Sequence, residues 1–241
     1  GHPVVVGGRE FHNNDHSVIL DCDLAGVHNG QVDLNSFNSD IGILKTGTDT
    51  EAMLNFYKKL GEEEFLRNVK GAYVVAIADK RKKDIIVMRD RFGIRPGVLG
   101  WKDGKYVVAS EDFTLIENGA KFVEDLDRGS IYWLSYDGGY RKKKVVDENP
   151  KSCFFEYNYL AHLSSTIDGL NVRVLREKLG EVLAEEFHPN DVDLVTFLPR
   201  CPEEAGRSYA KKIKKPFIPT LYKMRGERAF QGSTPRERQD S

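Results

Sequence analysis

Three arginines and one aspartate lie in the stretch Met88–Gly100, between two apolar, strand-like runs. The chemistry open to these residues is ion pairing around a tight corner, which Gly93 and Pro96 are suited to form. The charged side chains must pair or meet solvent, because burial of an unpartnered charge is costly. Taken by its residues alone, the stretch is a hairpin corner closed by a salt bridge.

The cysteines and histidines are the residues most suited to act as nucleophiles or metal ligands. Cys22, Cys153 and Cys201 are widely spaced and include no Cys-x-x-Cys pair. Their spacing favours a reducing, intracellular setting and argues against a disulfide framework or a self-contained zinc site. The six histidines, His12 and His16 among them, show no spacing typical of metal ligands.

The composition is that of a soluble protein without a strong electrostatic field. The chain of 241 residues is 40% hydrophobic and 30% charged, with a formal net charge of -1. We therefore expect no nucleic-acid partner, and the lack of a run of about 18 apolar residues predicts no membrane partner. The basic stretch from Arg207 to Ser241 is either a solvated tail or a phosphate-facing surface.

The elements that would position these residues begin with two strand-like runs, Val18–Leu20 and Leu24–Val27. Asn29-Gly30 then gives a strong turn signal, because both residues tolerate a positive φ. Residues 31–47 are polar and rich in Gly, Asn and Ser, so we expect a loop there.

A helix is predicted to begin at Thr48, which can form a capping box with Glu51. Apolar residues then recur at helical spacing until Gly61, which ends the run. A second short helix is expected over residues 62–69. Both helices are expected on one face of a sheet.

Short apolar or alternating runs follow and predict strands separated by turns. They are Tyr73–Ala78, Ile85–Met88, Val98–Trp101, Tyr106–Ser110, Ile131–Ser135 and Tyr140–Val146. Such closely spaced runs favour an antiparallel meander over a parallel sheet. We therefore predict an α+β first domain over residues 1–150.

The pattern changes again in the remainder, residues 151–241. A helix is expected over residues 171–187, with its apolar side chains on one stripe. That stripe consists of Val172, Leu175, Leu179, Val182 and Leu183. The sequence therefore predicts that the helix packs through this stripe.

A strand, a helix and a strand are expected next, at residues 194–198, 203–213 and 217–221. This order is a single βαβ unit, which opens a parallel α/β domain. One such unit does not cover both faces of its own sheet. The second domain is therefore expected to be only partly contained in residues 151–241.

The charged corner resembles the core of the class II glutamine amidotransferases, most closely that of the amidophosphoribosyltransferases. The match is the string Arg-Asp-x-x-Gly-Ile-Arg-Pro at residues 89–96, followed by Ala109-Ser110-Glu111.

Other motifs resemble that family in the same order along the chain. Ala25–Gly30 is similar to its Ala-His-Asn-Gly turn, and Thr46–Glu51 is similar to the start of one of its helices. Cys153–Ala161 resembles the segment that links its glutaminase and phosphoribosyltransferase domains. Tyr222–Arg238 is weakly similar to the segment before its flexible active-site loop.

The resemblance implies an N-terminal-nucleophile (Ntn) hydrolase-like fold, an αββα sandwich of two antiparallel sheets, followed by a helix and the start of a phosphoribosyltransferase-like α/β domain. It also implies an oxyanion hole formed by the side-chain amide of Asn29 and the backbone N–H of Gly30. Asp49 matches the acid that binds the α-ammonium group of glutamine. The plain alternatives are an ordinary Asn-Gly turn and a carboxylate favoured near a helix N-terminus.

Two features of the sequence depart from the family. The nucleophilic N-terminal cysteine of the family is not found, since the sequence as given starts at Gly1-His2. Arg9 is a conceivable but weakly supported substitute for the family's arginine that holds the substrate carboxylate. The acidic loop that binds ribose phosphate and metal is also absent, and residues 161–165 depart from the family's Ala-Arg-Pro-Asp-Ser. As written, the chain is expected to be unable to catalyse either half-reaction by the family's mechanism.

Three hypotheses follow for the function. The first is an amidophosphoribosyltransferase homologue, presented incomplete, whose family uses glutamine to aminate phosphoribosyl pyrophosphate in purine biosynthesis. The second is a degenerate, non-catalytic protein that senses a ligand or binds a partner. The third is an assembly partner of a separate catalytic chain.

The resemblance also carries expectations about cofactors, partners and location. Mg²⁺ is implied by the family alone, and no cofactor is evident in the residues. Cys153 matches one ligand of the [4Fe–4S] cluster of some members, but an inert thiol is expected here. Glutamine or a related small amino acid, a homo-oligomer and a cytoplasmic location complete the expectations.

Overall fold

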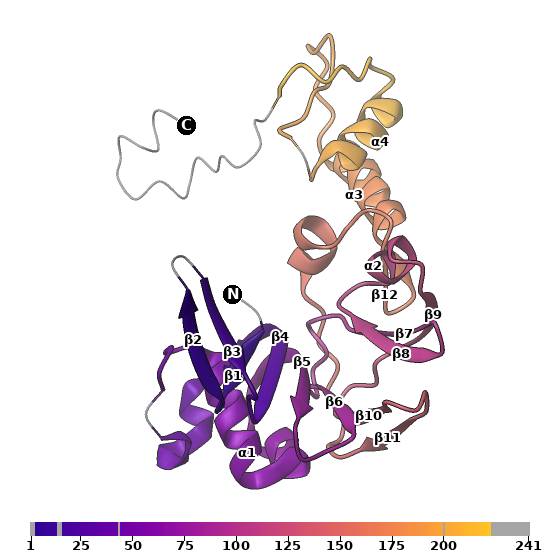
Figure 1. The fold of residues 1–241 in the computed structure, drawn as a ribbon. Coiled ribbons are helices and arrows are strands. Elements are labelled where there is room, and N and C mark those ends of the chain that lie inside the picture. Colours follow the sequence, from indigo (N-terminus) through magenta and orange to yellow (C-terminus); the bar gives the residue numbers. More distant parts are fainter. Residues whose placement is uncertain (1–2, 14–15, 43, 200, 223–241) are drawn as a thin grey trace, which may run out of the picture. The chain divides into compact units, whose positions relative to one another are not determined.

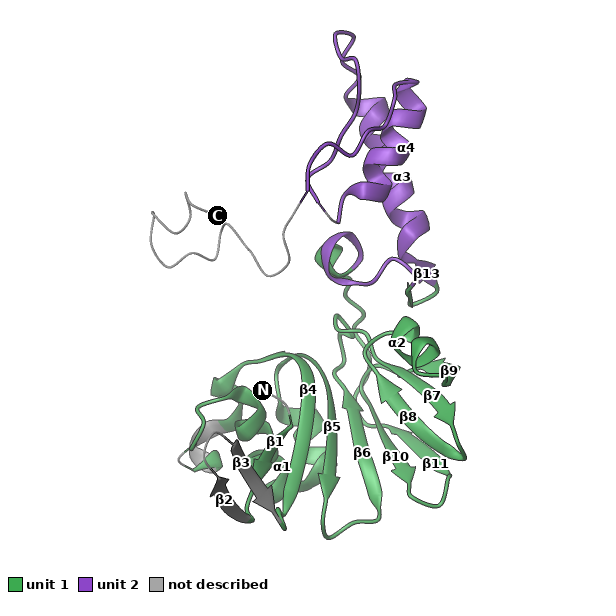
Figure 2. Cartoon of the chain, turned by 45° about the horizontal axis from the view of Figure 1, so that its top comes forward, with its two compact units in different colours: residues 1–156, 165–169 green, residues 157–164, 170–241 purple. Residues whose placement is uncertain are grey.

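The computed structural model of the protein describes residues 3–13, 16–42, 44–199 and 201–222 (Figure 1). The chain divides into two compact units (Figure 2). Unit 1 comprises residues 1–156 and 165–169, and unit 2 comprises residues 157–164 and 170–241. No helix in the described ranges is long and apolar enough to cross a membrane.

Unit 1 is built on a six-stranded antiparallel sheet with the order β1-β4-β5-β6-β10-β11. Its strands are β1 (Val4–Val6), β4 (Leu24–Val32), β5 (Gly71–Asp79), β6 (Asp84–Arg89), β10 (Ser130–Ser135) and β11 (Tyr140–Lys144). The central strands are apolar on both sides because both faces of the sheet are covered. The edge strand β11 is charged and exposed, which protects the edge from further pairing.

A second antiparallel sheet has the order β8-β7-β9. Its strands are β7 (Val98–Lys102), β8 (Lys105–Ala109) and β9 (Lys121–Asp125). The short helix α2 (Asp112–Glu117) lies between β8 and β9 in sequence. A separate hairpin pairs β2 (Arg9–Asn13) with β3 (His16–Leu20), and the short strand β12 is Thr166–Ile167.

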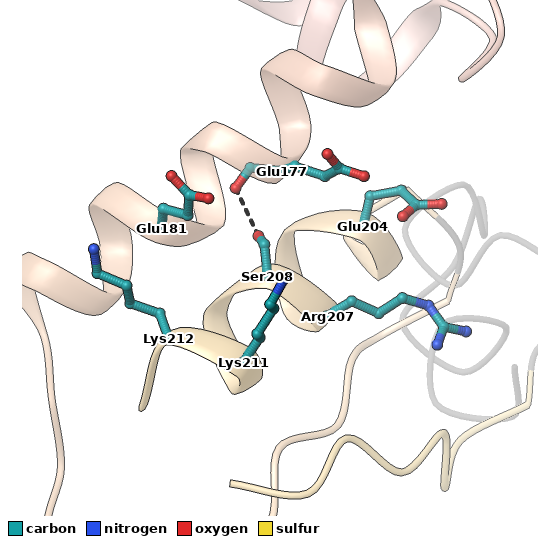
Figure 3. Close-up of a pocket in the computed structure, with 7 residues that line it drawn as sticks. All are labelled: Glu177, Glu181, Glu204, Arg207, Ser208, Lys211 and Lys212. Atoms are coloured by element: carbon teal, nitrogen blue, oxygen red, sulfur yellow. Dashed lines mark hydrogen bonds between the residues drawn. The ribbon is translucent and has the colours of Figure 1, made fainter. Parts of the chain in front are cut away.

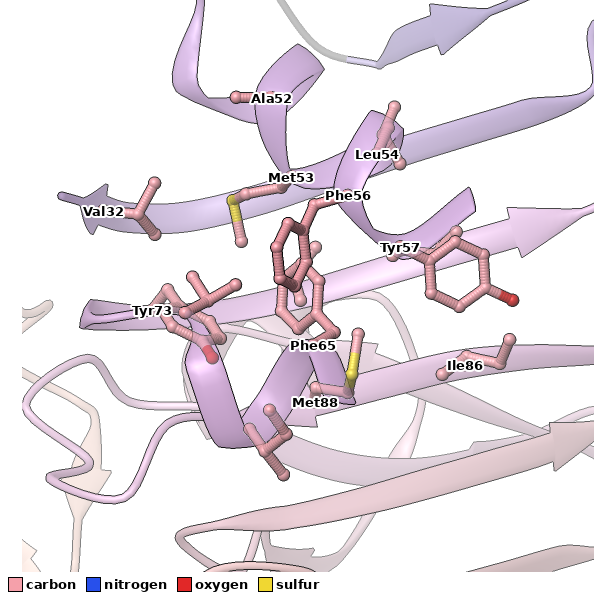
Figure 4. Packing of buried hydrophobic residues seen from close by; sticks show 14 of the residues in the cluster. Val32, Ala52, Met53, Leu54, Phe56, Tyr57, Phe65, Tyr73, Ile86 and Met88 are labelled. Carbon is pink, nitrogen blue, oxygen red and sulfur yellow. The ribbon is translucent and has the colours of Figure 1, made fainter. Parts of the chain in front are cut away.

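Three apolar clusters lie between successive layers of unit 1. The largest joins helix α1 (Asp49–Asn68) to one face of the six-stranded sheet (Figure 4). The second joins the two sheets, with Val87 and Tyr132 on one side and Leu99 on the other. The third joins the smaller sheet to α2 through Leu115. The layers therefore follow the predicted αββα order, and the α+β fold class is confirmed.

Helix α1 begins where the sequence predicts, because Thr48 caps it. The Thr48 hydroxyl accepts a hydrogen bond from the Glu51 amide at 3.3 Å. The reciprocal bond of a capping box does not form, since the Glu51 carboxylate binds the amides of Lys45 and Thr46 instead. Gly61 has φ +80° and kinks the helix, which separates the two predicted helical segments.

Several expectations for unit 1 were wrong in detail. Asn29-Gly30 is not a turn but lies inside β4, paired with β5, because the strand runs on to Val32. The expected loop at residues 31–47 contains a 3-10 helix over Leu34–Ile41, capped by the Asp33 carboxylate. Elements β1, β2, α2 and β9 were not predicted, because each is short or carries few apolar residues.

The charged corner is held by backbone groups more than by a salt bridge. The buried Arg89 guanidinium donates to the carbonyls of Gly93, Arg95 and Leu126. The Asp90 carboxylate accepts from the amides of Tyr73, Phe92 and Gly93. Burial raises the pKa of Asp90 and lowers that of Arg89, and these hydrogen bonds offset the cost of burying both groups.

Unit 2 contains two packed helices, α3 (Val172–Glu186) and α4 (Glu203–Ile213), at the predicted positions. The short strand β13 (Leu170–Asn171) precedes α3, and Asn171 caps it by accepting from the Val174 amide. A π-helical turn is assigned over Glu156–Leu160. The expected strands around α4 are reduced to a single parallel bridge between Val195 and Phe217.

The predicted packing stripe of α3 was correct at Val172, which is buried, and wrong at Val182 and Leu183. The buried residues of α3 are Val172, Arg176, Gly180 and Ala184. Of the predicted stripe, Val182 and Leu183 are exposed. Helix α4 approaches so closely that a Cβ on Gly180 would lie 2.0 Å from the Ala205 carbonyl oxygen, and this contact selects the small-residue face.

Candidate functional site

The predicted site residues come from the end of β4 and the first turn of α1, both in unit 1. His28 connects the two elements. Its Nε2 lies 3.1 Å from the Gly30 carbonyl oxygen and 3.4 Å from Asp49 Oδ2. Its Nδ1 lies 2.8 Å from the Thr50 hydroxyl. Asp49 and Gly30 are therefore brought to the same imidazole, although 19 positions separate them in the sequence.

Asn29 faces the smaller sheet, because successive side chains of a strand point to opposite faces. Its Nδ2 donates to the Ser110 hydroxyl at 3.3 Å. Both residues line a pocket of ≈ 180 Å³ between the two sheets, together with His28 and apolar side chains of β4, β5 and β8. The amide of Asn29 is thus placed at a polar end of a largely apolar pocket.

Gly30 is required by its backbone geometry. Its φ is +142°, and a Cβ at this position would lie 2.0 Å from the Ala72 carbonyl oxygen on β5. Any other residue would clash with the neighbouring strand. The glycine therefore allows β4 and β5 to approach closely beside the Asn29 amide.

Asp49 is the first residue of α1, where the helix dipole favours a negative charge. Its side chain is 27% exposed, so the carboxylate remains accessible to a ligand. The loop before it is fixed by Glu51, which accepts hydrogen bonds from the Lys45 and Thr46 amides and from the Thr46 hydroxyl. These bonds lower the pKa of Glu51 although burial opposes them, so the carboxylate stays charged.

His28 and Ser110 were not predicted as site residues. Both belong to motifs that the sequence supplied, His28 to Ala25–Gly30 and Ser110 to Ala109–Glu111. The available signal was the contrast between these polar residues and the apolar strands that carry them. Their contacts are seen only in the structure, where β4 brings His28 to Thr50 on α1 and Asn29 to Ser110.

The three cysteines lie elsewhere. None of Cys22, Cys153 and Cys201 lines the pocket beside Asn29, and all three are free thiols. The side chain of Arg9 and most of the segment Tyr222–Arg238 lie outside the described residues. Among the residues that the structure describes, no three His, Cys, Asp or Glu side chains converge to hold a metal ion.

A larger groove of ≈ 450 Å³ lies between α3 and α4 in unit 2 (Figure 3). Its walls carry both signs of charge, and Ser208 donates to the Glu177 carbonyl across it. Lys212 pairs with Glu185, and Arg207 pairs with Glu203. Four of the charged residues that line the groove form ion pairs, namely Glu181, Glu204, Arg207 and Lys212, and we assign no binding role to the groove.

Comparisons with known proteins agree with the geometry of unit 1. Residues 31–146 match a family described as a glutamine amidotransferase domain, and Asn29 and Gly30 directly precede this range. The amidophosphoribosyltransferase of Mycobacterium bovis is 36% identical over 160 residues, which cover 66% of this chain and 30% of that protein. The Bacillus subtilis enzyme of the same name is 30% identical over 214 residues, with coverages of 84% and 44%.

A solved structure extends the likeness to nearly the whole chain. The glutamine phosphoribosylpyrophosphate amidotransferase of B. subtilis, complexed with ADP and GMP, superposes with a TM-score of 0.78 at 28% identity. The match covers 98% of this chain and 53% of that one, so the present chain spans about half of this relative. The chain belongs to the class II glutamine amidotransferases, and its relatives there are amidophosphoribosyltransferases.

Proposed function

We propose that unit 1 binds glutamine and forms the glutaminase part of an amidophosphoribosyltransferase. The observation that carries this proposal is the convergence of Gly30 and Asp49 on His28, with the Asn29 amide on the next residue of β4. Asn29 lines the ≈ 180 Å³ pocket, whereas Asp49 contacts the His28 ring and does not line that pocket. The proposal assigns the side-chain amide of glutamine to Asn29 and its α-ammonium group to Asp49, by likeness to the family.

Each residue has a distinct proposed role. The Asp49 carboxylate would accept hydrogen bonds from the α-ammonium group, a charge-assisted contact favoured by its exposure. The Asn29 amide and the Gly30 N–H would donate to the oxyanion that forms when the side-chain amide is attacked. In other enzymes, loss of one such donor costs about 3 kcal/mol of transition-state stabilisation.

The nucleophile is not among the residues that form this site, since no cysteine lines it. The proposal therefore assigns binding and oxyanion stabilisation to this chain's own residues. The attacking group belongs to a position next to the Asn29 amide, where the bond to the substrate carbon would form and the ammonia would leave.

Calorimetric titration of the natural gene product with L-glutamine tests the proposal. We expect measurable binding, and Asp49→Asn should weaken it by about tenfold or more because a charged hydrogen bond is lost. Asp103→Asn, in the remote β7–β8 turn, is the matched control and should bind as the parent does. Failure of the parent to bind glutamine or glutamate would overturn the proposal.

Ammonia release separates the catalytic version from the alternative. Asn29→Ala should leave glutamine affinity nearly unchanged while ammonia release falls by roughly 10²–10³-fold. Binding without any ammonia release by the parent would instead support a ligand-sensing or partner-binding module.

The remaining features of the relatives belong to the same proposal. They are amination of phosphoribosyl pyrophosphate with Mg²⁺, homo-oligomerisation and a cytoplasmic location. The parallel bridge and helix α4 support only the start of an α/β domain in unit 2, and the other features follow from the family resemblance alone. Light scattering of the natural gene product would test the oligomeric state.

A further inference from the structure

We infer that His28 is a positioning residue that holds the Asp49 carboxylate at a fixed place relative to the Gly30 backbone. Its effect would be to set the preference of the site for ligands that carry an α-ammonium group. This inference rests on the proposed function, in which Asp49 binds that group.

The imidazole of His28 is almost completely enclosed. Its side chain is 5% exposed, and Thr50, which contacts Nδ1, is itself buried. A buried ring with polar neighbours at both nitrogens has little freedom to rotate. The positions of Gly30 O and Asp49 Oδ2 are therefore related through a rigid group, not through a flexible chain.

The surroundings of the ring fix where its hydrogen lies. The Gly30 carbonyl and the Asp49 carboxylate can only accept hydrogen bonds, so Nε2 must carry the hydrogen. Nδ1 lies 2.8 Å from the Thr50 hydroxyl, which can either donate or accept. The ring thus has a polar partner at both nitrogens, and its Nε2–H is shared between strand and helix.

In sequence, β4 and α1 are joined by a long connection, and apolar packing also holds α1 on the sheet. Residues 33–48 lie between them and include the 3-10 helix. At the end of this connection, Thr48 accepts from the Glu51 amide, and the Glu51 carboxylate accepts from the Lys45 and Thr46 amides. These bonds join the connection to α1 but do not reach β4. His28 instead carries hydrogen bonds from the strand to the first turn of α1, where Asp49 stands at the solvent-accessible edge.

Two substitutions separate the functions of the two ring nitrogens. His28→Gln places an amide N–H near the position of Nε2 and retains a donor to Asp49 and Gly30. His28→Asn places its carbonyl near the position of Nδ1 and retains an acceptor for Thr50, but it loses the donor to Asp49. If His28 positions Asp49, the two variants should therefore differ in their affinity for glutamine, although their side chains are of similar polarity.

The test measures affinity for L-glutamine and for glutaramate, which is glutamine without its α-amino group. We expect His28→Asn to weaken glutamine binding by about tenfold and His28→Gln by no more than about threefold. Glutaramate affinity should change by less than about twofold in both variants, because it makes no contact with Asp49. Melting temperatures near that of the parent would show that folding is intact.

If His28→Asn fails to fold, Thr50→Val replaces it. This variant removes the hydroxyl that orients Nδ1, and it should reduce glutamine affinity while sparing glutaramate. Equal loss of both ligands would indicate a merely structural role and overturn the inference. So would unchanged glutamine affinity in His28→Asn or Thr50→Val, provided that Asp49→Asn weakens binding. Failure of the parent to bind glutamine would instead defeat the proposed function itself.

Discussion

Helices α1 and α3 begin alike but bury different kinds of side chain. Each is capped by a side-chain oxygen, that of Thr48 or of Asn171, which accepts a backbone hydrogen bond three residues on. The buried face of α1 is mostly large and apolar, and it includes Met53, Leu54, Phe56, Tyr57, Phe65 and Leu66. The buried face of α3 consists of Val172, Arg176, Gly180 and Ala184.

The difference lies in what each helix packs against. Helix α1 covers a twisted sheet, where bulky side chains are needed to fill the space between layers (Figure 4). Helix α3 meets another helix at very close range, where only small residues fit. The same local rules thus start both helices, while the tertiary partner decides which face is buried.

The largest effect is expected in the α1 layer, at Phe65. This ring is buried and packs edge-to-face against Phe56 and Tyr73 at centroid distances of 6.2 and 5.8 Å. Phe65→Ala should destabilise unit 1 by about 3–5 kcal/mol through the cavity it leaves. Both tryptophans of the chain lie in unit 1, so denaturant unfolding followed by tryptophan fluorescence measures this.

Leu183→Ala on α3 is the matched control, since Leu183 is 50% exposed. We expect its effect on the protection of α3 amides from hydrogen exchange to be below about 1 kcal/mol. A loss of stability in Leu183→Ala as large as that in Phe65→Ala would contradict the view that α3, unlike α1, does not pack through its large apolar side chains.

The next largest effect is expected at Arg176, the buried charge of α3. Its guanidinium donates to the carbonyls of Tyr157 and Ala161, and the residue is 3% exposed. Arg176→Met leaves both carbonyls without these donors and should destabilise unit 2 by about 2–3 kcal/mol. Hydrogen exchange of residues 172–186 reports the change.

Arg173→Met is the control for the loss of charge. Arg173 is half-exposed on the same helix and pairs with Glu204. Surface pairs contribute at most about 1 kcal/mol, so little change is expected. Equal losses of amide protection in Arg176→Met and Arg173→Met would mean that the charge of the side chain, and not its burial, determines the stability of α3.

The sequence was sufficient wherever local signals and tertiary packing agree. The start of helix α1, the interruption at Gly61 and the strand at residues 85–88 were predicted because capping, periodicity and burial coincide there, although two separate helices were expected in place of one kinked helix. The stripe of α3 was mispredicted at Val182 and Leu183, because apolar periodicity cannot anticipate a close helix contact at Gly180. Tertiary context overrode propensity in that case.

The candidate site divides in the same way. Asn29, Gly30 and Asp49 were expected from motifs, and the structure places Asp49 and Gly30 at one imidazole. His28 and Ser110 were missed, because a contact across 22 or 81 positions leaves no periodic signal. The turn assigned to Asn29-Gly30 failed because the pairing with β5 extends the strand through both residues.

A smaller effect is expected at Gly180, where the close helix contact can be broken. Alanine normally stabilises a helix by about 1 kcal/mol relative to glycine. Here the added Cβ would meet the Ala205 carbonyl oxygen at 2.0 Å and the Ser208 hydroxyl at 2.2 Å. Gly180→Ala should therefore destabilise the α3–α4 pair by about 1–3 kcal/mol, measured by hydrogen exchange of both helices.

Gly139→Ala serves as the matched control, because no atom lies within 4 Å of its added Cβ and its φ is not positive. We expect a change within about 0.5 kcal/mol at this position. Stabilisation of α3 by Gly180→Ala would show that the two helices are not in close contact.

The smallest effect concerns acid stability and contrasts an enclosed carboxylate of unit 1 with an exposed one of unit 2. Asp79 accepts hydrogen bonds from the Arg81 guanidinium and the Tyr57 hydroxyl, and these partners lower its pKa to about 2. Because the folded pKa lies below the unfolded value, this stability is present above about pH 4 and is lost as the pH falls towards 2.

Asp79→Asn should therefore lower the free energy of unfolding of unit 1 by on the order of 1–2 kcal/mol at pH 6, and the difference should shrink between pH 4 and 2. Urea unfolding at several pH values, followed by tryptophan fluorescence, measures the free-energy difference at pH 6 and its decrease at lower pH. Glu185→Gln is the counterpart in unit 2, where the exposed Lys212 lowers the pKa of Glu185. Because solvent and salt screen that pair, the protection of α3 amides should be nearly the same in Glu185→Gln as in the parent. A pH-independent difference for Asp79→Asn would mean that its carboxylate contributes through packing and not through its charge.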